Sequence, residues 1–137
     1  MVLDRGATAS DCTAPYRRRR PERTLLYQTR VPLLRDASLE GWISALEQLA
    51  RLPAKTIIPG HGPVVTQEQA GQTLAYLRAL KATVGELYKQ GIGRSESAAL
   101  ARLPAFESWN LYEVIHPQNV QQLYLQLERE DPDRKER

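Results

Sequence analysis

The sequence predicts a helix-rich α/β (α+β) domain over residues 24–130, preceded by a disordered N-terminal arm. Apolar residues recur at helical spacing in three long segments, which begin near Ser38, Gln67 and Pro117. A short run rich in β-branched residues, 55–58, lies between the first two and is typical of a strand. A chain of 137 residues is long enough to bury one modest core.

Residues 1–23 form the arm, because they are polar, contain Gly, Pro, Ser and Thr, and show no periodicity. The 19 Lys and Arg residues exceed the 16 Asp and Glu by three, but four of the 19 are the consecutive arginines 17–20, which leaves 15 against 16 elsewhere. The basic character therefore belongs to the arm. Only Tyr16 accompanies the arginines and no nucleic-acid-binding motif follows, so we do not expect nucleic acid to be the partner. Residues 131–137 form a charged tail.

Membrane insertion and export are not expected. A membrane-spanning helix needs about 20 predominantly apolar residues, and no stretch of the sequence approaches this length. The arginine run is not followed by the apolar segment of about 7–15 residues that a secretory signal requires, so the chain as written is expected in the cytoplasm. The single cysteine, Cys12, cannot form an internal disulfide.

The first elements of the domain are a strand and a helix. Residues 24–34 have the composition of a strand, interrupted at Pro32 in a way that favours an edge position. Asp36 and Ser38 are candidate N-caps for a helix that runs to about Arg51. Its buried stripe is predicted to comprise Leu39, Trp42, Ile43, Leu46 and Leu49.

Three further helices are expected. The longest spans about 67–89, with Gly91 or Gly93 as its stop. A short one lies near 95–103, and the last begins near Pro117, a residue suited to a first helical turn. The apolar residues of the last helix are Val120, Leu123, Tyr124 and Leu127.

The strongest local signal for chemistry is the Gly60-His61-Gly62 motif, which directly follows the strand 55–58. The two glycines allow a sharp turn that presents the imidazole at the rim of a sheet, a common position for a metal ligand. The motif alone leaves an alternative open, in which His61 is an ordinary surface residue in a tight turn. His61 is the one candidate metal ligand in the chain.

Five segments occur along the chain in this order: Arg30–Leu34, Leu39–Trp42, Leu52–Ala54, Pro59–Pro63 and Tyr112–Val120. Together they resemble the C-terminal half of the metallo-β-lactamase-fold hydrolases. The last of them resembles in particular the ending of the quinoprotein relay system zinc metallohydrolases, relatives of the SoxH-type sulfur-oxidation proteins. The resemblance covers about 24–130, and the combination is more specific than any one segment.

The resemblance implies one half of a four-layered αββα sandwich whose active site holds one or two zinc ions. The family's ligands are a His-x-His-x-Asp-His motif, a later His, the Asp of a Gly-Asp pair and the His of a Gly-His-Gly loop. Only His61 has a counterpart here, and Glu22-Arg23 stands where the Gly-Asp pair is expected. His116 occupies no ligand position, and we expect it to pack near the start of the last helix, with a pocket-lining role as the alternative. Members often work in the periplasm.

These observations predict a truncated zinc hydrolase. The parent enzyme would use metal-activated water, for which about three protein ligands are needed. We expect that this chain alone does not retain zinc and is inactive. The alternative is a non-catalytic interaction module, because half of a sandwich leaves one sheet face uncovered and prone to association. Its partner would be a second copy or a complementing chain.

Overall fold

The computed structural model describes residues 2–4, 29–35, 38–58 and 64–131. Over these residues the chain is helix-rich and has one small antiparallel sheet, which confirms the α+β class. The elements are β1 (Val2–Asp4), α1 (Leu39–Ala50), β2 (Thr56–Ile58), β3 (Val65–Thr66), α2 (Gln67–Lys89), α3 (Arg94–Leu100), the short 3-10 helix η2 (Pro104–Phe106) and α4 (Tyr112–Glu130).

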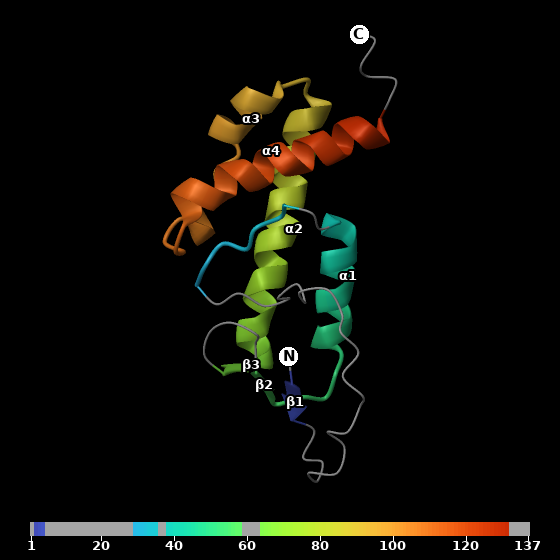
Figure 1. Ribbon diagram of the computed structural model, residues 1–137, viewed down its shortest axis with the longest axis vertical. Helices are drawn as coiled ribbons and strands as arrows, with labels where there is room; N and C mark the ends of the chain where they lie inside the picture. Colours follow the sequence, from blue (N-terminus) through green and yellow to red (C-terminus); the bar gives the residue numbers. More distant parts are fainter. Residues whose placement is uncertain (1, 5–28, 36–37, 59–63, 132–137) are drawn as a thin grey trace.

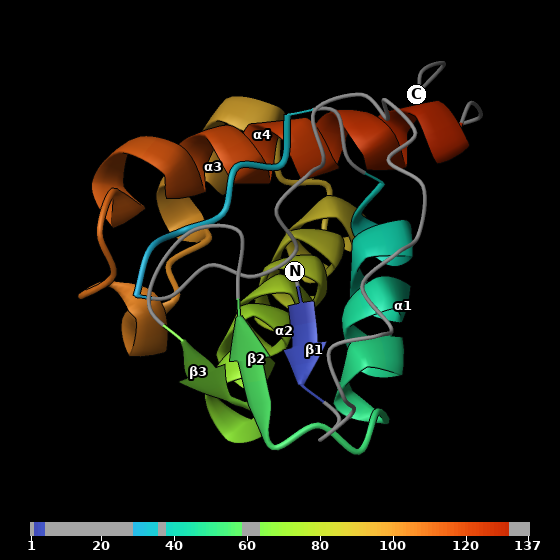
Figure 2. The same ribbon diagram turned by 60° about the horizontal axis from the view of Figure 1, so that its bottom comes forward.

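Helix α2 is the central element, and the other helices pack around it (Figure 1). Helix α1 lies along the part of α2 nearest the strands, whereas α4 crosses the other part. Helix α3 packs mainly against α4. The strands lie at the end of the molecule where α2 begins (Figure 2). Among the described residues, no helix has both the length and the apolar character needed to cross a bilayer.

The sheet has the order β1-β2-β3, with both pairs antiparallel. Ile57 of β2 pairs with Val65 of β3, and both side chains are buried in the core. The predicted strand at 55–58 is confirmed as β2. Strand β1 lies within the segment 1–23 that the sequence predicts to be disordered, and for residues 2–4 that prediction is wrong because their main chain pairs with β2. Residues 5–23 lie outside the described part of the chain.

Helix α1 confirms the prediction closely. Ser38 is its N-cap, and the Ser38 hydroxyl accepts a hydrogen bond from the Gly41 N–H at 3.2 Å. All five residues of the predicted stripe are buried. Trp42 is among them, so it contributes to the core rather than to an exposed platform.

Helix α2 also has the predicted bounds, because a local signal in the sequence marks its start and another marks its end. Thr66 and Gln69 form a capping box at its start. At its end, Gly91 adopts a φ of 84°, the Gly91 N–H bonds to the Tyr88 carbonyl, and the Ile92 N–H bonds to the Leu87 carbonyl. This pattern is a Schellman motif, and of the two predicted stops Gly91 is the one used.

Gly71, in the first part of α2, offers a test of local stability. A Cβ built at Gly71 meets nothing within 4 Å, so Gly71→Ala is expected to raise the free energy of unfolding by about 0.5–1 kcal/mol through helix propensity. Gly91→Ala is the matched control, and it is expected to lower stability by about 1 kcal/mol because φ is positive there. Urea unfolding measures both. Destabilisation by Gly71→Ala would show that this part of α2 is packed differently.

The strand predicted at 24–34 is wrong for the residues that are described, 29–34, which form only an isolated bridge between Arg30 and Asn110. The physical reason lies in their main-chain partners. Pro32 has no N–H to donate, and the Leu34 N–H bonds to a side chain of α4. This extended segment is therefore held by α4 and the turn before it rather than by a neighbouring strand.

The predicted start of the last helix at Pro117 is also wrong. Helix α4 begins at Tyr112 and contains Pro117 in its second turn. Proline there removes one main-chain hydrogen bond, but the turn before it is fixed by the burial of Tyr112, Ile115 and His116. Leu111, the N-cap, adopts a left-handed conformation with φ of 64°.

The short helix α3 exists as predicted but ends at Leu100 rather than at residue 103. It stops because Ala101 leaves the helical conformation, with ψ of 60°. The main-chain groups after α3 bond to side chains of α4 instead of continuing the helix. The Ala101 carbonyl accepts a hydrogen bond from His116, and the Leu103 N–H donates one to the Tyr112 hydroxyl. The turn after α3 is thereby tied to α4.

Candidate functional site

His61, the predicted metal ligand, lies in 59–63, outside the described residues. The strand before the motif, β2, is the one that the sequence predicts. A second strand, β3, follows the motif. Ile58 and Val64, the nearest described neighbours, are 43% and 58% exposed. Cys12, Glu22, Arg23 and the arginine run also lie outside the described part of the chain.

The other histidine belongs to a buried polar cluster of three residues, Tyr76, His116 and Asn119. None of the three side chains is more than 1% exposed. Tyr76 comes from the middle of α2, whereas His116 and Asn119 lie one turn apart on α4. Because buried polar groups are costly unless they are hydrogen-bonded, each partner in this cluster matters.

The hydrogen bonds of His116 define its protonation state. Its Nε2 lies 2.5 Å from the Ala101 carbonyl oxygen, which can only accept, so Nε2 carries the proton. Its Nδ1 lies 3.0 Å from the Tyr76 hydroxyl and accepts from it in the neutral ring. The Tyr76 oxygen in turn accepts from the Asn119 amide at 3.0 Å. A neutral His116 therefore satisfies the whole cluster.

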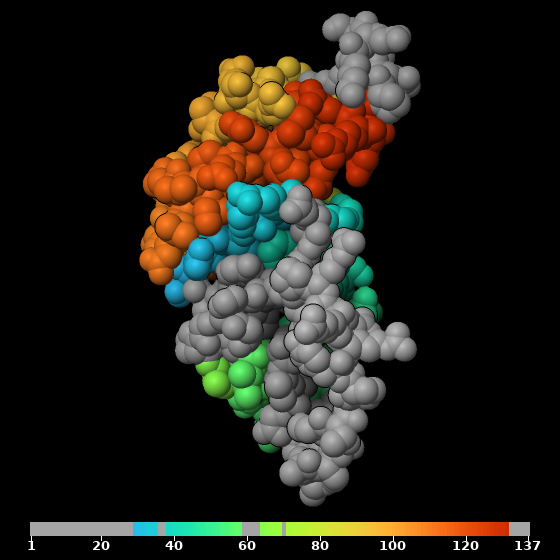
Figure 3. Space-filling model, viewed as in Figure 1, coloured from blue at the N-terminus to red at the C-terminus, as the bar shows by residue number. Residues whose placement is uncertain are grey.

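Asn119 extends the cluster to the segment 29–35. Its Nδ2 donates to the Pro32 carbonyl at 2.6 Å, and its Oδ1 accepts from the Leu34 N–H at 2.8 Å. Figure 3 shows part of this segment lying against α4 at the surface. One side chain thus replaces the hydrogen bonds that a neighbouring strand would have supplied.

Aromatic rings enclose the cluster. Tyr112 stacks on the His116 ring, with centroids 4.4 Å apart and an interplanar angle of 12°. Trp109 stacks on Tyr76 and Phe106 meets it edge-on, at 5.8 and 5.4 Å. These contacts exclude water from His116 and make its surroundings weakly polar.

This burial controls the ionisation of the cluster. Desolvation lowers the pKa of His116, partly offset by its hydrogen bond to the Ala101 carbonyl, and burial raises the pKa of Tyr76. Both side chains are therefore in their neutral forms near neutral pH. The pair joins the middle of α2 to the second turn of α4 within the core.

His116 does not fit the role of a zinc ligand, since Tyr76 and Ala101 occupy both of its ring nitrogens. Within the residues that the structure describes, no three His, Cys, Asp or Glu side chains gather closely enough to hold a metal ion. His61, which lies outside the described part of the chain, is thus the residue on which the zinc centre implied by the resemblance would depend.

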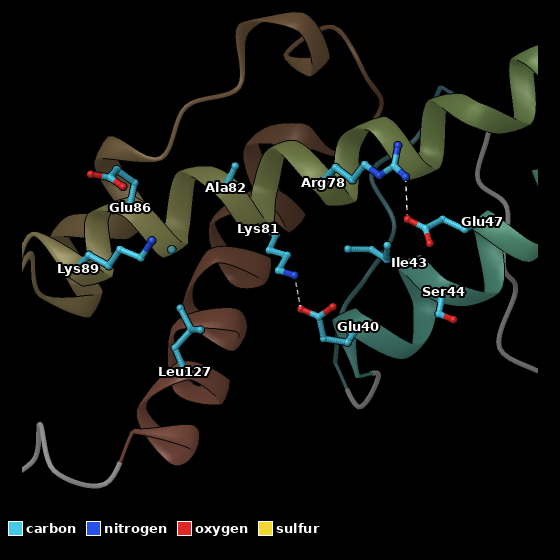
Figure 4. Close-up of a pocket in the computed structure, with 11 residues that line it drawn as sticks. Glu40, Ile43, Ser44, Glu47, Arg78, Lys81, Ala82, Glu86, Lys89 and Leu127 are labelled. Atoms are coloured by element: carbon cyan, nitrogen blue, oxygen red, sulfur yellow. Dashed lines mark hydrogen bonds and ion pairs between the residues drawn. The ribbon is translucent and has the colours of Figure 1, made fainter.

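A groove of about 620 Å³ lies between α1 and α2, and Leu127 of α4 also lines it (Figure 4). Two ion pairs cross it, Arg78 to Glu47 at 2.7 Å and Lys81 to Glu40 at 2.5 Å. Its other lining residues are Ile43, Ser44, Ala82, Gly85, Glu86 and Lys89. Sequence patterns did not identify this groove, although its residues recur at helical spacing on both helices.

The polar cluster was also missed by sequence reasoning, except that His116 was expected to pack near the start of the last helix, and its burial is confirmed. The available signal was the placement of His116 and Asn119 on the same face as Val120 and Leu123. Polar residues on a buried face must find partners within the fold.

No protein-family model matches the chain, and no curated protein matches it either.

Proposed function

We propose that the chain derives from the C-terminal half of a metallo-β-lactamase-fold zinc hydrolase and acts as a non-catalytic association module. Two segments that carry the resemblance, Arg30–Leu34 and Tyr112–Val120, lie far apart in the sequence. Their contact through Asn119 supports the proposal, because the matching residues belong to one packed domain. In this proposal the motif residues of α4 serve the fold rather than a reaction.

The observation that carries the proposal is the use of both ring nitrogens of His116 in the core. The chain has two histidines and one cysteine, so His61 is the one imidazole left for a metal. A catalytic zinc site takes about three protein ligands, commonly histidines, and leaves one position open for water. His61 by itself supplies one.

Zinc binding and hydrolysis provide the direct test. The purified chain, loaded with zinc and then dialysed, is expected to hold far less than one equivalent of metal and to turn over neither an ester nor a β-lactam. His61→Ala is expected to change neither the zinc content nor the turnover. His116→Gln, the control for the second histidine, is likewise expected to leave both unchanged. One tightly held zinc with turnover that His61→Ala abolishes would overturn the proposal.

Association is supported by the exposed apolar side chains at the ends of β2 and β3. Ile58 and Val64 expose about half of their surface next to a sheet of very short strands, and exposed apolar surface and unpaired strand edges favour contact with another chain. We expect light scattering to give a mass that rises with concentration above that of one chain. A monomeric mass at every concentration would contradict association with a second copy.

A further inference from the structure

The charges where α1 and α2 lie side by side differ in sign between the two helices. We call this surface the α1–α2 face, and it consists of the groove residues of the two helices. Its α1 charges, Glu40 and Glu47, are both acidic, and their ion-pair partners on α2, Arg78 and Lys81, are both basic. The groove also contains Glu86 and Lys89, which lie beyond these pairs toward the end of α2.

These charges remain accessible although they are paired within the chain. The side chains of Glu40 and Lys81 are 65% and 52% exposed, and those of Glu47 and Arg78 are 36% and 58% exposed. Exposed ion pairs of this kind contribute little to stability. Because the side chains are exposed, each can also contact a group of opposite charge on another chain.

Other residues that line the groove are small or apolar. They are Ile43, Ser44, Ala82 and Gly85, and a Cβ built at Gly85 meets nothing within 4 Å. Another helix can approach closely over such residues. The surface thus combines a shallow seam with an acidic side and a basic side.

We propose that a second copy of this chain docks on the α1–α2 face about a twofold axis parallel to the helices. This axis places α1 of one copy over α2 of the other at the same level. Glu40 of each copy then faces Lys81 of the other, and Glu47 faces Arg78. Each level carries two carboxylates and two cations in alternation, an arrangement in which every close contact is attractive.

Charge also selects this arrangement over the other face-to-face twofold dimer. An axis perpendicular to the helices places α1 over α1 and α2 over α2, which sets acidic rows against acidic rows and basic rows against basic rows. Such contacts are repulsive. The inference rests on the self-association proposed above and adds a second contact surface to it, because Ile58 and Val64 lie outside the α1–α2 face.

Charge reversal tests the inference in the full chain. Two double variants, Glu40→Lys with Glu47→Lys and Arg78→Glu with Lys81→Glu, each give the four charges of the two ion pairs the same sign. Sedimentation velocity at low salt is expected to show that each double variant dimerises at least about tenfold more weakly than wild type. An equimolar mixture of the two is expected to form a heterodimer.

The fourfold variant that combines all the changes is the matched control, because it keeps the ion pairs within the chain with their signs exchanged. It is expected to dimerise like wild type, and thermal unfolding verifies that every variant folds. Wild-type association that neither double variant weakens would overturn this surface while leaving the association proposal intact. A monomeric wild type would overturn both.

Discussion

Replacing Asn119 with leucine, a side chain of similar size, is expected to lower the free energy of unfolding by about 3 kcal/mol or more. The change removes the acceptor of the Leu34 N–H and the donor to the Pro32 carbonyl, and both groups lie in buried residues. Each buried polar group left without a partner costs about 1–3 kcal/mol. The Tyr76 hydroxyl also loses a donor. Urea unfolding at neutral pH measures the effect.

The matched control is Asn110→Ala. Asn110 is exposed and contacts the same segment through its main chain, to Val31 and Thr29. Its replacement is expected to change stability by no more than about 0.5 kcal/mol. Hydrogen exchange adds a local measurement, because the Leu34 amide is expected to lose its protection in the Asn119 variant. Equal effects of the two substitutions would show that Asn119 does not hold the segment.

The elements that the sequence predicts correctly are those specified by neighbouring residues. Helix α1 combines a capping Ser38 with an apolar stripe at helical spacing. Helix α2 begins after the capping box at Thr66, and Gly91 provides the turn that stops it after Lys89. Strand β2 is short, but its β-branched residues and the following Pro-Gly bound it clearly. Each of these signals lies within a few residues of the element it specifies.

The predictions that fail depend on contacts between distant residues. The segment 29–34 has the composition of a strand, yet its hydrogen bonds go to Asn119, 85 positions beyond Leu34. Likewise, Pro117 is a good first-turn residue, but burial of Tyr112 extends the helix ahead of it. Tertiary packing overrides local preference in both cases.

The candidate site was predictable only in part, for the same reason. His61 is predicted from its flanking glycines alone, which is a local pattern, and it stays a prediction because it lies outside the described residues. The environment of His116 is not, since Tyr76 and Ala101 come from other parts of the chain and approach it only in the folded state. A histidine's chemistry follows from its neighbours in space, and a single sequence shows only its neighbours along the chain.

Acidification is expected to destabilise the fold through His116. Burial lowers the pKa of His116 in the folded protein below its ordinary value of 6.5. Between these two values the unfolded chain binds a proton that the folded chain does not. The contribution of neutral His116 to the free energy of unfolding is therefore fully present above about pH 6.5. It is lost as the pH decreases below this value, by up to about 1.4 kcal/mol per pH unit. Urea unfolding between about pH 5 and 7 measures this slope, above the range in which most carboxylates titrate.

The geometry explains why protonation is costly at this position. A protonated ring has an N–H at Nδ1, directed at a Tyr76 hydroxyl that already accepts from Asn119. Of the charged groups near the ring, Arg102 opposes protonation, whereas Glu113 and Glu107 favour it weakly from the surface. His116→Gln is expected to remove most of the slope, and His61→Gln to leave that contribution in place. If His116→Gln kept the full slope, the proton would be bound elsewhere and the buried cluster would not be its origin.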